Sequence, residues 1–476
     1  MKKINNIEEL CGKRCDILGL GISNLPLMDI LMNSGATVTV RDKKSRAELG
    51  DVCERAEATG VRFILGESYL DGIDADVIFR SPGIRPDAGS IPHALKNGAI
   101  LTSEMELFLS LTKAKILAIT GSDGKTTTTT LTHLFLKKQA ERYRSSRAYV
   151  GGNIGTPLLS EYSNMSESDF SVLELSSFQL MTASFSPARA AITNITPNHL
   201  NWHTDMSEYI RAKKNVYGES TLLVLNAENG ITEQIARERR DNIVLFSSSK
   251  KSFEEFSLSG INVGAIFLRD DEIVYSDGRN EETLLYASDI ILPGKHNIEN
   301  YMTAIALTYG LVDKDIYTEV AKTFGGVEHR LEFVRELDGV RYYNSSIDSS
   351  PTRTAAALSA LAGPKVVICG GYDKNIPFDT LADALCGSVR CVILTGATAA
   401  KIKKALLECE KYSPDVITVI EKPEFADAVA EARAVAVSGD SVLLSPACAS
   451  FDAFKNFEER GNRFKALVNN FSSDKN

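Results

Sequence analysis

One short segment of the chain combines the residue types that hold a chain of phosphate groups. It runs from Ile119 to Thr127 (ITGSDGKTT) and follows Lys115–Thr120, an apolar run that predicts a buried strand. Glycines let backbone N–H groups approach phosphate oxygens, a lysine adds positive charge near the β- and γ-phosphates, and a threonine hydroxyl can bind Mg²⁺. The standard P-loop has glycine where this chain has Ile119, so the loop is a shortened variant. The sequence predicts a nucleoside triphosphate site formed by Gly121, Ser122, Asp123, Gly124, Lys125, Thr126 and Thr127.

Two further residues of the same block could hold a metal ion beside those phosphates. Glu174 lies in the strand predicted at Ser171–Leu175, and His199 follows the strand predicted at Ala190–Ile195. Ligands in open α/β sheets bind beyond the carboxyl ends of strands. A lone glutamate there is often solvated and a lone histidine often a simple hydrogen-bonding residue, so both readings stay open. Lys213 lies in a later helical stretch, where a lysine is ordinarily a solvated charge.

The N-terminal part carries a near-match to the dinucleotide-binding fingerprint. Gly19-Leu20-Gly21-Ile22-Ser23-Asn24 stands between a strand predicted at Cys15–Leu18 and a helix predicted at Asn24–Asn33. Asp42 follows the second strand, where it could bind a ribose hydroxyl, and Ser81-Pro82-Gly83 ends the third. Asn24 replaces the third glycine, which argues against NAD as the ligand. A tight turn that binds no ligand would require the same glycines, so this explanation stays open. We interpret the segment as a nucleotide or sugar-nucleotide site.

Three later polar clusters follow or open predicted elements. Gly294–Asn300 (GKHNIEN) opens a helix and could meet a nucleotide. Arg330 follows a double glycine and could reach a phosphate, and Pro446–Gly461 follows the last predicted strand. Taken singly, each cluster has an ordinary structural explanation.

Composition and charge bound the function classes. The chain has 476 residues, 43% hydrophobic and 24% charged, which is typical of a multidomain globular protein. The 53 basic and 62 acidic residues give a net charge of −9, which argues against a nucleic-acid binder. No run approaches a membrane span of roughly 20 apolar residues. The first charged residues are followed by acidic residues, where a signal peptide would need an apolar stretch. The eight cysteines form no CxxC pair, so we expect a cytoplasmic protein with reduced thiols and no membrane partner.

The alternation of short apolar runs with helical patterns predicts an α/β fold without repeats. A second block opens at about Met105, with a further strand at Thr221–Leu225. The third block contains strands predicted at Lys365–Cys369, Cys391–Thr395 and Ser441–Leu444. The polar motifs fall at the ends of strands in all three blocks.

Taken in order, these motifs resemble the Mur ligase family along essentially the whole chain. The segments that carry the resemblance are TGSDGKTT, GGNIG (Gly151–Gly155), ELSSFQL, NHLNWH, RAKK, GKHNIEN, EHRLE and SPACASFDAFKNFEERG. The last segment is similar to the version in the family members that add D-glutamate. A folylpolyglutamate synthase shares the phosphate loop and its lysine, but the N-terminal block does not match one.

The resemblance implies three domains and a reaction. Residues 1–104 would form a Rossmann-like domain for the uridine nucleotide, and 105–325 a central P-loop-type ATPase domain with a mostly parallel sheet. Residues 326–476 would form a Rossmann-like domain for the incoming amino acid. ATP would phosphorylate the carboxylate of UDP-N-acetylmuramoyl-L-alanine, and the amine of D-glutamate would displace the phosphate to form an amide. The resemblance thus implies a cytoplasmic enzyme of peptidoglycan precursor synthesis that acts on small molecules, and we expect a monomer.

The same resemblance assigns residues. Lys125, Lys213, His199 and Glu174 would be catalytic, with two Mg²⁺ ions held by Thr126 and by Glu174, His199 and a carbamylated Lys213. Carbamylation would turn the lysine cation into an anion with two oxygens, suited to a hard metal ion. The remaining ATP contacts would be Asn297 and Arg330. Those to the uridine substrate would be Ile22, Ser23, Asp42, Ser81, Gly83 and Asn153, and those to D-glutamate Lys374, Ser349, Ser450 and Phe457.

The chain departs from the family pattern at three positions. Ser345 stands where the family often has an aspartate that contacts the ATP ribose, and Ile347 stands in place of a lysine. Asn201 stands where many members carry aspartate. No departure removes a metal ligand or the phosphate-loop lysine, so we expect activity.

Three alternatives remain at the level of sequence. One is a different Mur-type or folylpolyglutamate-like amide ligase, and another is an inactive nucleotide-binding homologue that has lost function through Ser345 and Ile347. The third, a nicotinamide-dependent oxidoreductase or sensor, would explain Gly19-Leu20-Gly21 but leaves the phosphate loop unexplained.

Overall fold

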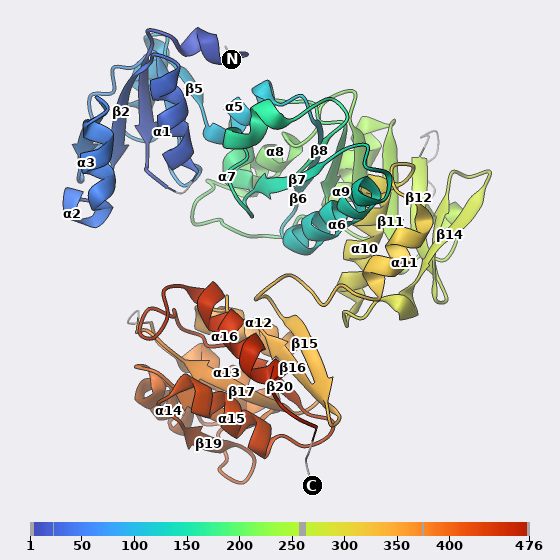
Figure 1. Cartoon of the computed structure of the whole chain (residues 1–476). Coiled ribbons are helices and arrows are strands. Elements are labelled where there is room, and N and C mark those ends of the chain that lie inside the picture. Colours follow the sequence, from blue (N-terminus) through green and yellow to red (C-terminus); the bar gives the residue numbers. More distant parts are fainter. Residues whose placement is uncertain (1–3, 22, 257–262, 374–375, 474–476) are drawn as a thin grey trace. The chain divides into compact units, whose positions relative to one another are not determined.

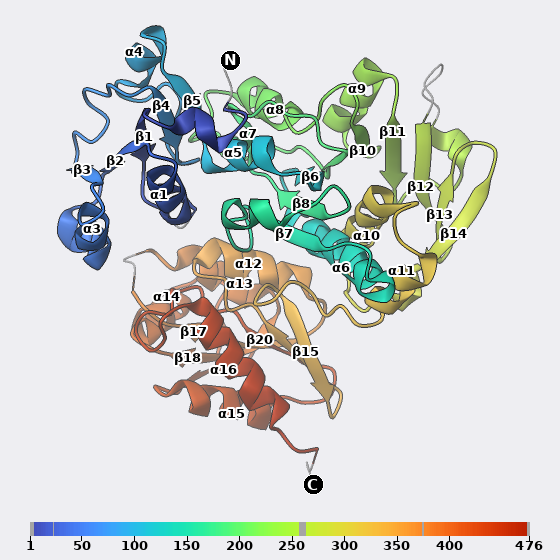
Figure 2. The same ribbon diagram turned by 45° about the horizontal axis from the view of Figure 1, so that its top comes forward.

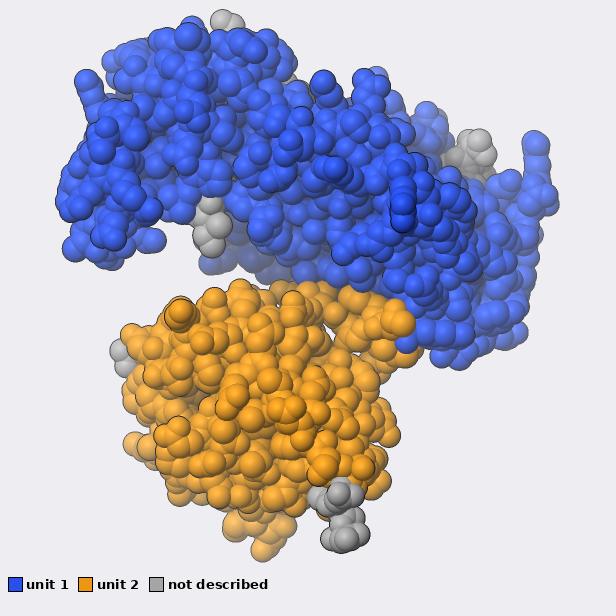
Figure 3. Space-filling view, viewed as in Figure 1, with its two compact units in different colours: residues 1–289, 295–322 blue, residues 290–294, 323–476 orange. Residues whose placement is uncertain are grey.

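A computed structural model describes residues 4–21, 23–256, 263–373 and 376–473 (Figure 1). The chain forms two compact units, which Figure 3 shows in different colours. Unit 1 comprises residues 1–289 and 295–322, and unit 2 comprises residues 290–294 and 323–476. Ile22 and Lys374, both expected to bind substrates, lie outside the described residues.

The N-terminal part of unit 1 is a five-stranded parallel sheet in the order β3-β2-β1-β4-β5. Its strands are β1 (Arg14–Leu18), β2 (Thr37–Asp42), β3 (Arg62–Leu65), β4 (Val77–Arg80) and β5 (Ile100–Thr102). Its helices are η1 (Ile7–Leu10), α1 (Asn24–Asn33), α2 (Arg46–Leu49), α3 (Asp51–Glu57) and α4 (Ile91–Lys96). The chain leaves β1 for β2 on one side and later enters β4 on the other, so the turn after β1 lies at the switch point where such sheets bind ligands.

The rest of unit 1 is built on a nine-stranded sheet in the order β14-β13-β12-β11-β10-β9-β6-β8-β7. The strands are β6 (Lys115–Thr120), β7 (Ala148–Gly152), β8 (Phe170–Glu174), β9 (Arg189–Ile192), β10 (Leu222–Asn226), β11 (Ile243–Ser247), β12 (Val263–Arg269), β13 (Glu272–Ser276) and β14 (Glu281–Tyr286). Pairing is parallel from β7 to β12, and the last two strands add an antiparallel meander.

Helices cover this sheet, and the longest of them carries the phosphate loop at its start. They are α5 (Glu104–Leu111), α6 (Lys125–Tyr143), η2 (Leu159–Asn164), α7 (Ser177–Leu180), α8 (Met206–Lys214), α9 (Gly230–Arg239), η3 (Phe253–Phe256), η4 (Ala287–Asp289), α10 (Lys295–Thr308) and α11 (Lys314–Ala321). Helices α6 and α10 pack against each other (Figures 1 and 2). A continuous hydrophobic cluster includes residues of both sheets of unit 1, from Ile4 to Val274.

Unit 2 is a six-stranded sheet in the order β15-β16-β20-β17-β18-β19, parallel except for β15 at one edge. The strands are β15 (Glu332–Leu337), β16 (Val340–Asn344), β17 (Lys365–Gly370), β18 (Val389–Thr395), β19 (Thr418–Glu421) and β20 (Ser441–Leu444). The helices are α12 (Pro351–Ala360), α13 (Asp379–Ser388), α14 (Ala399–Leu407), α15 (Phe425–Val435) and α16 (Phe457–Asn469). Two apolar clusters, one on each face of the sheet, form its core.

The predicted α/β class is confirmed by three mostly parallel sheets. Continuous apolar runs such as that of β6 form strands buried on both faces, which explains why they could be recognised. The domain boundaries at residues 104 and 325 stay predictions. No helix of the described ranges is long and apolar enough to cross a membrane.

Candidate active site

The phosphate loop lies between the end of β6 and the start of α6, as the sequence predicts. Its conformation requires glycine at two positions. Gly121 has φ 153° and a Cβ there would lie 1.8 Å from Thr193 Oγ1, while Gly124 has φ 78° and a Cβ would lie 2.4 Å from Asn300 Oδ1. The N-cap residue of α6 is Gly124, which makes no side-chain capping hydrogen bond, and the start of a helix favours an anion.

Residues that follow β9 hold the loop from one side. The N–H of Asp123 donates to Asn194 Oδ1 at 2.9 Å, and Thr193 Oγ1 donates to the Asp123 carbonyl at 2.6 Å. Ser122 is buried and shares a 2.9 Å hydrogen bond with the Tyr209 hydroxyl. Sequence reasoning did not identify Thr193, Asn194 or Tyr209. The strand predicted to reach residue 195 ends at Ile192, because the following residues turn to the loop.

Lys125 and Lys213 bring two amines to the same loop. Lys125 Nζ donates to the carbonyls of Gly121 and Ser122, both at 2.9 Å. Lys213 Nζ donates to the Gly121 carbonyl at 2.6 Å and lies 4.7 Å from the centre of the Tyr209 ring. Two amines at one carbonyl are a site where added negative charge would be stabilised.

Burial distinguishes Lys213 from its neighbour Lys214. The Lys213 side chain is 1% exposed, and burial together with the nearby Lys125 charge lowers its pKa to about 7. Lys214 is partly exposed and pairs with Glu238 at 2.7 Å on the surface. Because a large fraction of the Lys213 amine is neutral near pH 7, it can act as a nucleophile.

Glu174 ends β8 beside the loop, and one of its carboxylate oxygens has no partner. Oε1 accepts a hydrogen bond from Asn153 Nδ2 at 2.8 Å, and the Asn153 N–H donates to the Glu174 carbonyl at 2.8 Å. Oε2 is buried and accepts no hydrogen bond within the described residues. A buried carboxylate oxygen without a donor is costly, and a metal ion would satisfy it. Asn153 thus orients Glu174.

His199 follows β9 in a left-handed backbone conformation, with φ 55°. Its ring packs edge-on against Phe178 at 5.0 Å. Burial, followed by the charges of Lys125 and Lys213, lowers its pKa and favours the neutral imidazole that binds metals. The structure therefore places Lys125, Lys213 and His199 within electrostatic reach of one another, and Glu174 within reach of Lys213.

Among the residues that the structure describes, no group of three or more His, Cys, Asp or Glu side chains is arranged to hold a metal ion. Glu174 and His199 supply two ligands of these types. Thr126, in the first turn of α6, could add a hydroxyl, and Thr127 follows it. The open oxygen of Glu174 fits a hard cation, so the residues present are compatible with Mg²⁺.

Helix α10 meets the phosphate loop through its amides. Asn300 Nδ2 donates to Asn297 Oδ1 at 3.3 Å, and Asn300 Oδ1 accepts from Thr128 of α6. Sequence reasoning identified Asn297 but not Asn300, although both lie in the segment GKHNIEN. The contact of Asn300 with Gly124 could not be found without the packing of α10 on α6.

In the N-terminal sheet, the residues expected at the uridine site surround the turn after β1. Asp42 Oδ2 accepts a hydrogen bond from the Leu20 N–H at 2.6 Å, and Ser81 Oγ donates to the Gly19 carbonyl at 3.0 Å. Asn24, which replaces the third fingerprint glycine, donates to that carbonyl at 2.7 Å. Asn24 therefore fixes the turn. Ser23 immediately precedes α1.

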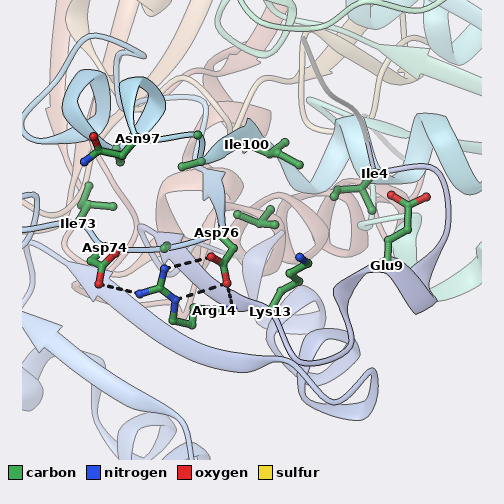
Figure 4. A pocket seen from close by; sticks show the side chains of 14 residues that line it. Ile4, Glu9, Lys13, Arg14, Ile73, Asp74, Asp76, Asn97 and Ile100 are labelled. Atoms are coloured by element: carbon green, nitrogen blue, oxygen red, sulfur yellow. Dashed lines mark hydrogen bonds and ion pairs between the residues drawn. The ribbon is translucent and has the colours of Figure 1, made fainter.

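A pocket of about 460 Å³ lies at the opposite ends of these strands (Figure 4). Arg14, the first residue of β1, pairs there with Asp74 at 2.7 Å and Asp76 at 3.0 Å. Two carboxylates thus neutralise this arginine, and the pocket is separate from the glycine turn that follows the other end of β1.

In unit 2, the loops that follow β16 and β20 are joined by Arg460 of α16. Its guanidinium is buried and donates to the carbonyls of Ser346, Cys448 and Ala449. The Phe457 carbonyl accepts from Ser346 Oγ at 2.8 Å. The structure thus brings Phe457 to the loop that contains Ser349, and Ser450 is buried in the other joined loop.

Asp348 places a carboxylate beside Ser345, the position where the family often has aspartate. Its side chain is hydrogen-bonded to Ser345 and accepts from Ser445 Oγ at 2.8 Å. Burial raises its pKa. The two residues and Ile347 line a pocket of about 240 Å³ together with Arg330. A carboxylate is therefore present although residue 345 is serine.

Two family models match the chain across this site. The Mur ligase middle domain matches residues 119–308, and the Mur ligase glutamate ligase domain matches residues 329–448. A protein of Acetivibrio thermocellus named UDP-N-acetylmuramoylalanine--D-glutamate ligase is 45% identical, with 99% of this chain and 98% of that protein covered. The chain belongs to the Mur ligase family.

Other Mur ligases support this assignment. Proteins of the same printed name from Clostridium kluyveri and Clostridium beijerinckii are each 46% identical, covering 96% and 98% of this chain and 96% and 99% of theirs. The solved structure of the UDP-N-acetylmuramate-alanine ligase MurC from Thermotoga maritima matches with a TM-score of 0.51 and 19% identity, covering 96% of this chain and 99% of MurC. At that identity it supports the Mur ligase fold alone.

Proposed function

We propose that this chain is an ATP-dependent ligase that joins D-glutamate to UDP-N-acetylmuramoyl-L-alanine in peptidoglycan precursor synthesis. The observation that carries the proposal is the similarity of 44–46% over nearly the whole chain to proteins of that name. The group formed by Lys125, Lys213, Glu174 and His199 at the phosphate loop supplies the chemistry.

The reaction asks the protein to bring anions together. The substrate carboxylate attacks the γ-phosphorus of ATP, ADP leaves, and an acyl phosphate forms. The D-glutamate amine then adds to the acyl carbon, loses a proton, and expels inorganic phosphate to leave the amide. The amine of Lys125 and the positive end of the α6 dipole would neutralise charge on the phosphates during transfer.

We assign two Mg²⁺ positions, one at Thr126 and one at Glu174, His199 and Lys213. When bound, the ions would supply positive charge to the phosphates and the substrate carboxylate. Glu174 Oε2 has no hydrogen-bond partner among the described residues, which supports the second position. Asn153 fixes that carboxylate through Oε1, which leaves Oε2 free to bind.

Lys213 joins this set as a carbamate. Its neutral amine would attack the carbon of CO₂ and lose a proton, giving a monoanion with two oxygens that suits a hard cation. Burial and the lowered pKa support this, because the reactive neutral form is populated near pH 7. Lys214 is a poor candidate for carbamylation, because its amine forms a surface ion pair with Glu238.

The remaining substrate contacts come from the three proposed domains, residues 1–104, 105–325 and 326–476, and Asn153 and Arg330 each serve a ligand of a neighbouring domain. Ser23, Asp42, Ser81, Gly83 and Asn153, with Ile22, would hold the sugar nucleotide. Asn297 and Arg330 would bind ATP with the phosphate loop, and Asp348 would take the role of the aspartate absent at Ser345. Ser349, Ser450 and Phe457, with Lys374, would hold D-glutamate. We further propose a cytoplasmic monomer, in keeping with the eight free cysteines.

The test is phosphate release from ATP and UDP-N-acetylmuramoyl-L-alanine with a panel of amino acids. We expect release with D-glutamate and little with L-glutamate, L-alanine or diaminopimelate. Release with another amino acid would indicate a different Mur-type ligase, and no release with any of them an inactive homologue. A parallel titration with NAD should give no binding, whereas tight NAD binding would favour the oxidoreductase.

A further inference from the structure

Within unit 1, the turn that follows β4 meets the segment that carries His199. Trp202 Nε1 donates to the Gly83 carbonyl at 3.1 Å, and Arg85 donates to the Trp202 carbonyl at 2.6 Å. The Arg85 guanidinium also stacks over the Trp202 ring, 5.1 Å from its centre. One tryptophan is thus held at both ends by residues of the other sheet.

Arg85 is fixed by two carboxylates from different elements. It donates to both oxygens of Glu208 in α8, at 3.1 and 3.2 Å, and to both oxygens of Asp87. Bidentate arginine–carboxylate pairs fix direction as well as distance. The Arg85 and Glu208 side chains are only 23% and 13% exposed, so solvent screens this pair weakly.

Glu208 continues the chain of contacts toward the metal-site residues. Its Oε2 lies 3.1 Å from His203 Nδ1, and His203 Nε2 is hydrogen-bonded to Ser177 Oγ at 2.9 Å. Ser177 is the first residue of α7, three positions after Glu174. The pairing with Arg85 lowers the pKa of Glu208 to about 2, so this carboxylate stays charged at physiological pH.

Aromatic rings next to these contacts reach both the segment that carries His199 and the phosphate loop. Phe178 of α7 contacts the rings of Trp202 and His199 at 4.4 and 5.0 Å. Tyr209, the residue after Glu208, contacts His203 at 5.2 Å and is hydrogen-bonded to Ser122 of the phosphate loop. A displacement of Glu208 would therefore be felt at His199 and at Ser122.

We propose that the Arg85–Glu208 ion pair is a positioning element that couples sugar-nucleotide binding at the Ser81–Gly83 turn to ordering of the phosphate and metal site. This inference rests on the proposed function for the identity of the two ligands. Each ligand then binds better when the other is present, because each orders the segment that the pair holds in common. By linkage the two enhancements are equal.

The experiment measures the affinity for UDP-N-acetylmuramoyl-L-alanine by calorimetry, with and without a saturating non-hydrolysable ATP analogue and Mg²⁺. In the wild type the analogue should tighten binding at least about fivefold, at the lower end of usual couplings. In Glu208→Gln the enhancement should fall to near onefold, with a fall in kcat that exceeds any rise in KM. In Arg85→Lys, which keeps the positive charge but cannot make the bidentate pair with Glu208, the enhancement should be intermediate.

Glu238→Gln is the matched control. Glu238 of α9 forms an ion pair with Lys214, which lies on the surface of α8, the helix that also contains Glu208. This substitution should leave the enhancement and kcat unchanged. A Glu208→Gln enzyme that keeps the wild-type enhancement would overturn the proposal, as would a wild type without enhancement. If Glu208→Gln lowers the affinity for both ligands equally and keeps the enhancement, the ion pair is merely structural, which would also overturn the proposal. If the wild type shows the enhancement but no phosphate release, the proposed function fails while the coupling stands.

Discussion

At the scale of single residues, the site depends on groups held in costly states. The Lys213 amine is buried beside the charge of Lys125, and Glu174 Oε2 is buried and has no donor within the described ranges. Each cost would be relieved by a ligand: CO₂ removes the positive charge of Lys213, and a cation satisfies Glu174. The carbamate–metal site that we propose would account for both residues together.

Lys213→Ala should reduce kcat by more than about 100-fold, the upper range for residues one step removed from a metal. A small carboxylate such as acetate or formate should restore part of the activity. Lys214→Ala is the control and should stay near the wild-type rate, because Lys214 only pairs with Glu238. Steady-state phosphate release checks both variants, and full activity in Lys213→Ala would refute the carbamate.

Asp348→Asn should raise the KM for ATP about tenfold, the equivalent of roughly 1.4 kcal/mol for a lost charged hydrogen bond. The KM for D-glutamate should change little. Asp415→Asn, at an exposed position of unit 2, controls for removal of a charge. A selective rise in the KM for D-glutamate would assign Asp348 to the amino acid instead.

At the scale of elements, the phosphate loop shows what sequence can and cannot predict. Gly121, Gly124 and Lys125 could be predicted because the loop is local: a buried strand, a glycine turn and a helix start in consecutive residues. Asn194, Tyr209 and Asn300 could not, because they reach the loop from distant parts of the chain. The β12–β14 meander is also not predicted. Its edge strand β14 begins with the exposed residues Glu281 and Glu282 instead of an apolar run.

Gly124→Ala should weaken binding of an ATP analogue at least about tenfold. The left-handed φ costs a non-glycine residue about 1–2 kcal/mol, and the added Cβ would strike Asn300 Oδ1. Gly230→Ala is the matched control, since no atom lies within 4 Å of a Cβ there and Gly230 starts a helix as well. Calorimetric titration would show the difference, and wild-type affinity in Gly124→Ala would mean that the loop is not the nucleotide site.

Helix α5 begins with a buried carboxyl that makes stability depend on pH. Burial raises the pKa of Glu104 to about 7, above its ordinary value of 4.5, and its Oε1 has no partner among the described residues. The folded state thus holds its proton more tightly, so this group's contribution to stability falls as pH rises from about 4.5 to 7. The free energy of unfolding of Glu104→Gln should equal that of the wild type near pH 4.5 and exceed it at pH 8 by up to about 3 kcal/mol.

Denaturant unfolding at the two pH values measures this difference. The exposed Glu167→Gln is the control and should follow the wild type at both. A Glu104→Gln protein that gains nothing at pH 8 would show that the carboxyl finds a partner or solvent there.

At the scale of the whole molecule, the proposed sites lie on different sheets. The turn proposed for the sugar nucleotide belongs to the five-stranded sheet and the phosphate loop to the nine-stranded sheet, while the residues proposed for D-glutamate lie in unit 2. A defect in one site should therefore spare binding at another when that second ligand is tested alone.

Lys125→Ala should abolish phosphate release and leave the affinity for UDP-N-acetylmuramoyl-L-alanine, measured without ATP, within about twofold of wild type. The lysine contacts carbonyls of its own loop, whereas the uridine turn is held by Asp42, Ser81 and Asn24. Equal loss of both properties would indicate misfolding or a wrong division of the sites.

The most direct test of the account follows oxygen atoms through one turnover. UDP-N-acetylmuramoyl-L-alanine with ¹⁸O in both carboxylate oxygens is incubated with ATP, Mg²⁺ and D-glutamate, and phosphate and product are examined by mass spectrometry. An acyl phosphate predicts one ¹⁸O in each released phosphate and one in the new amide of a product heavier by one glutamyl residue. Unlabelled phosphate, or phosphate release without the glutamyl product, would contradict the proposed ligase.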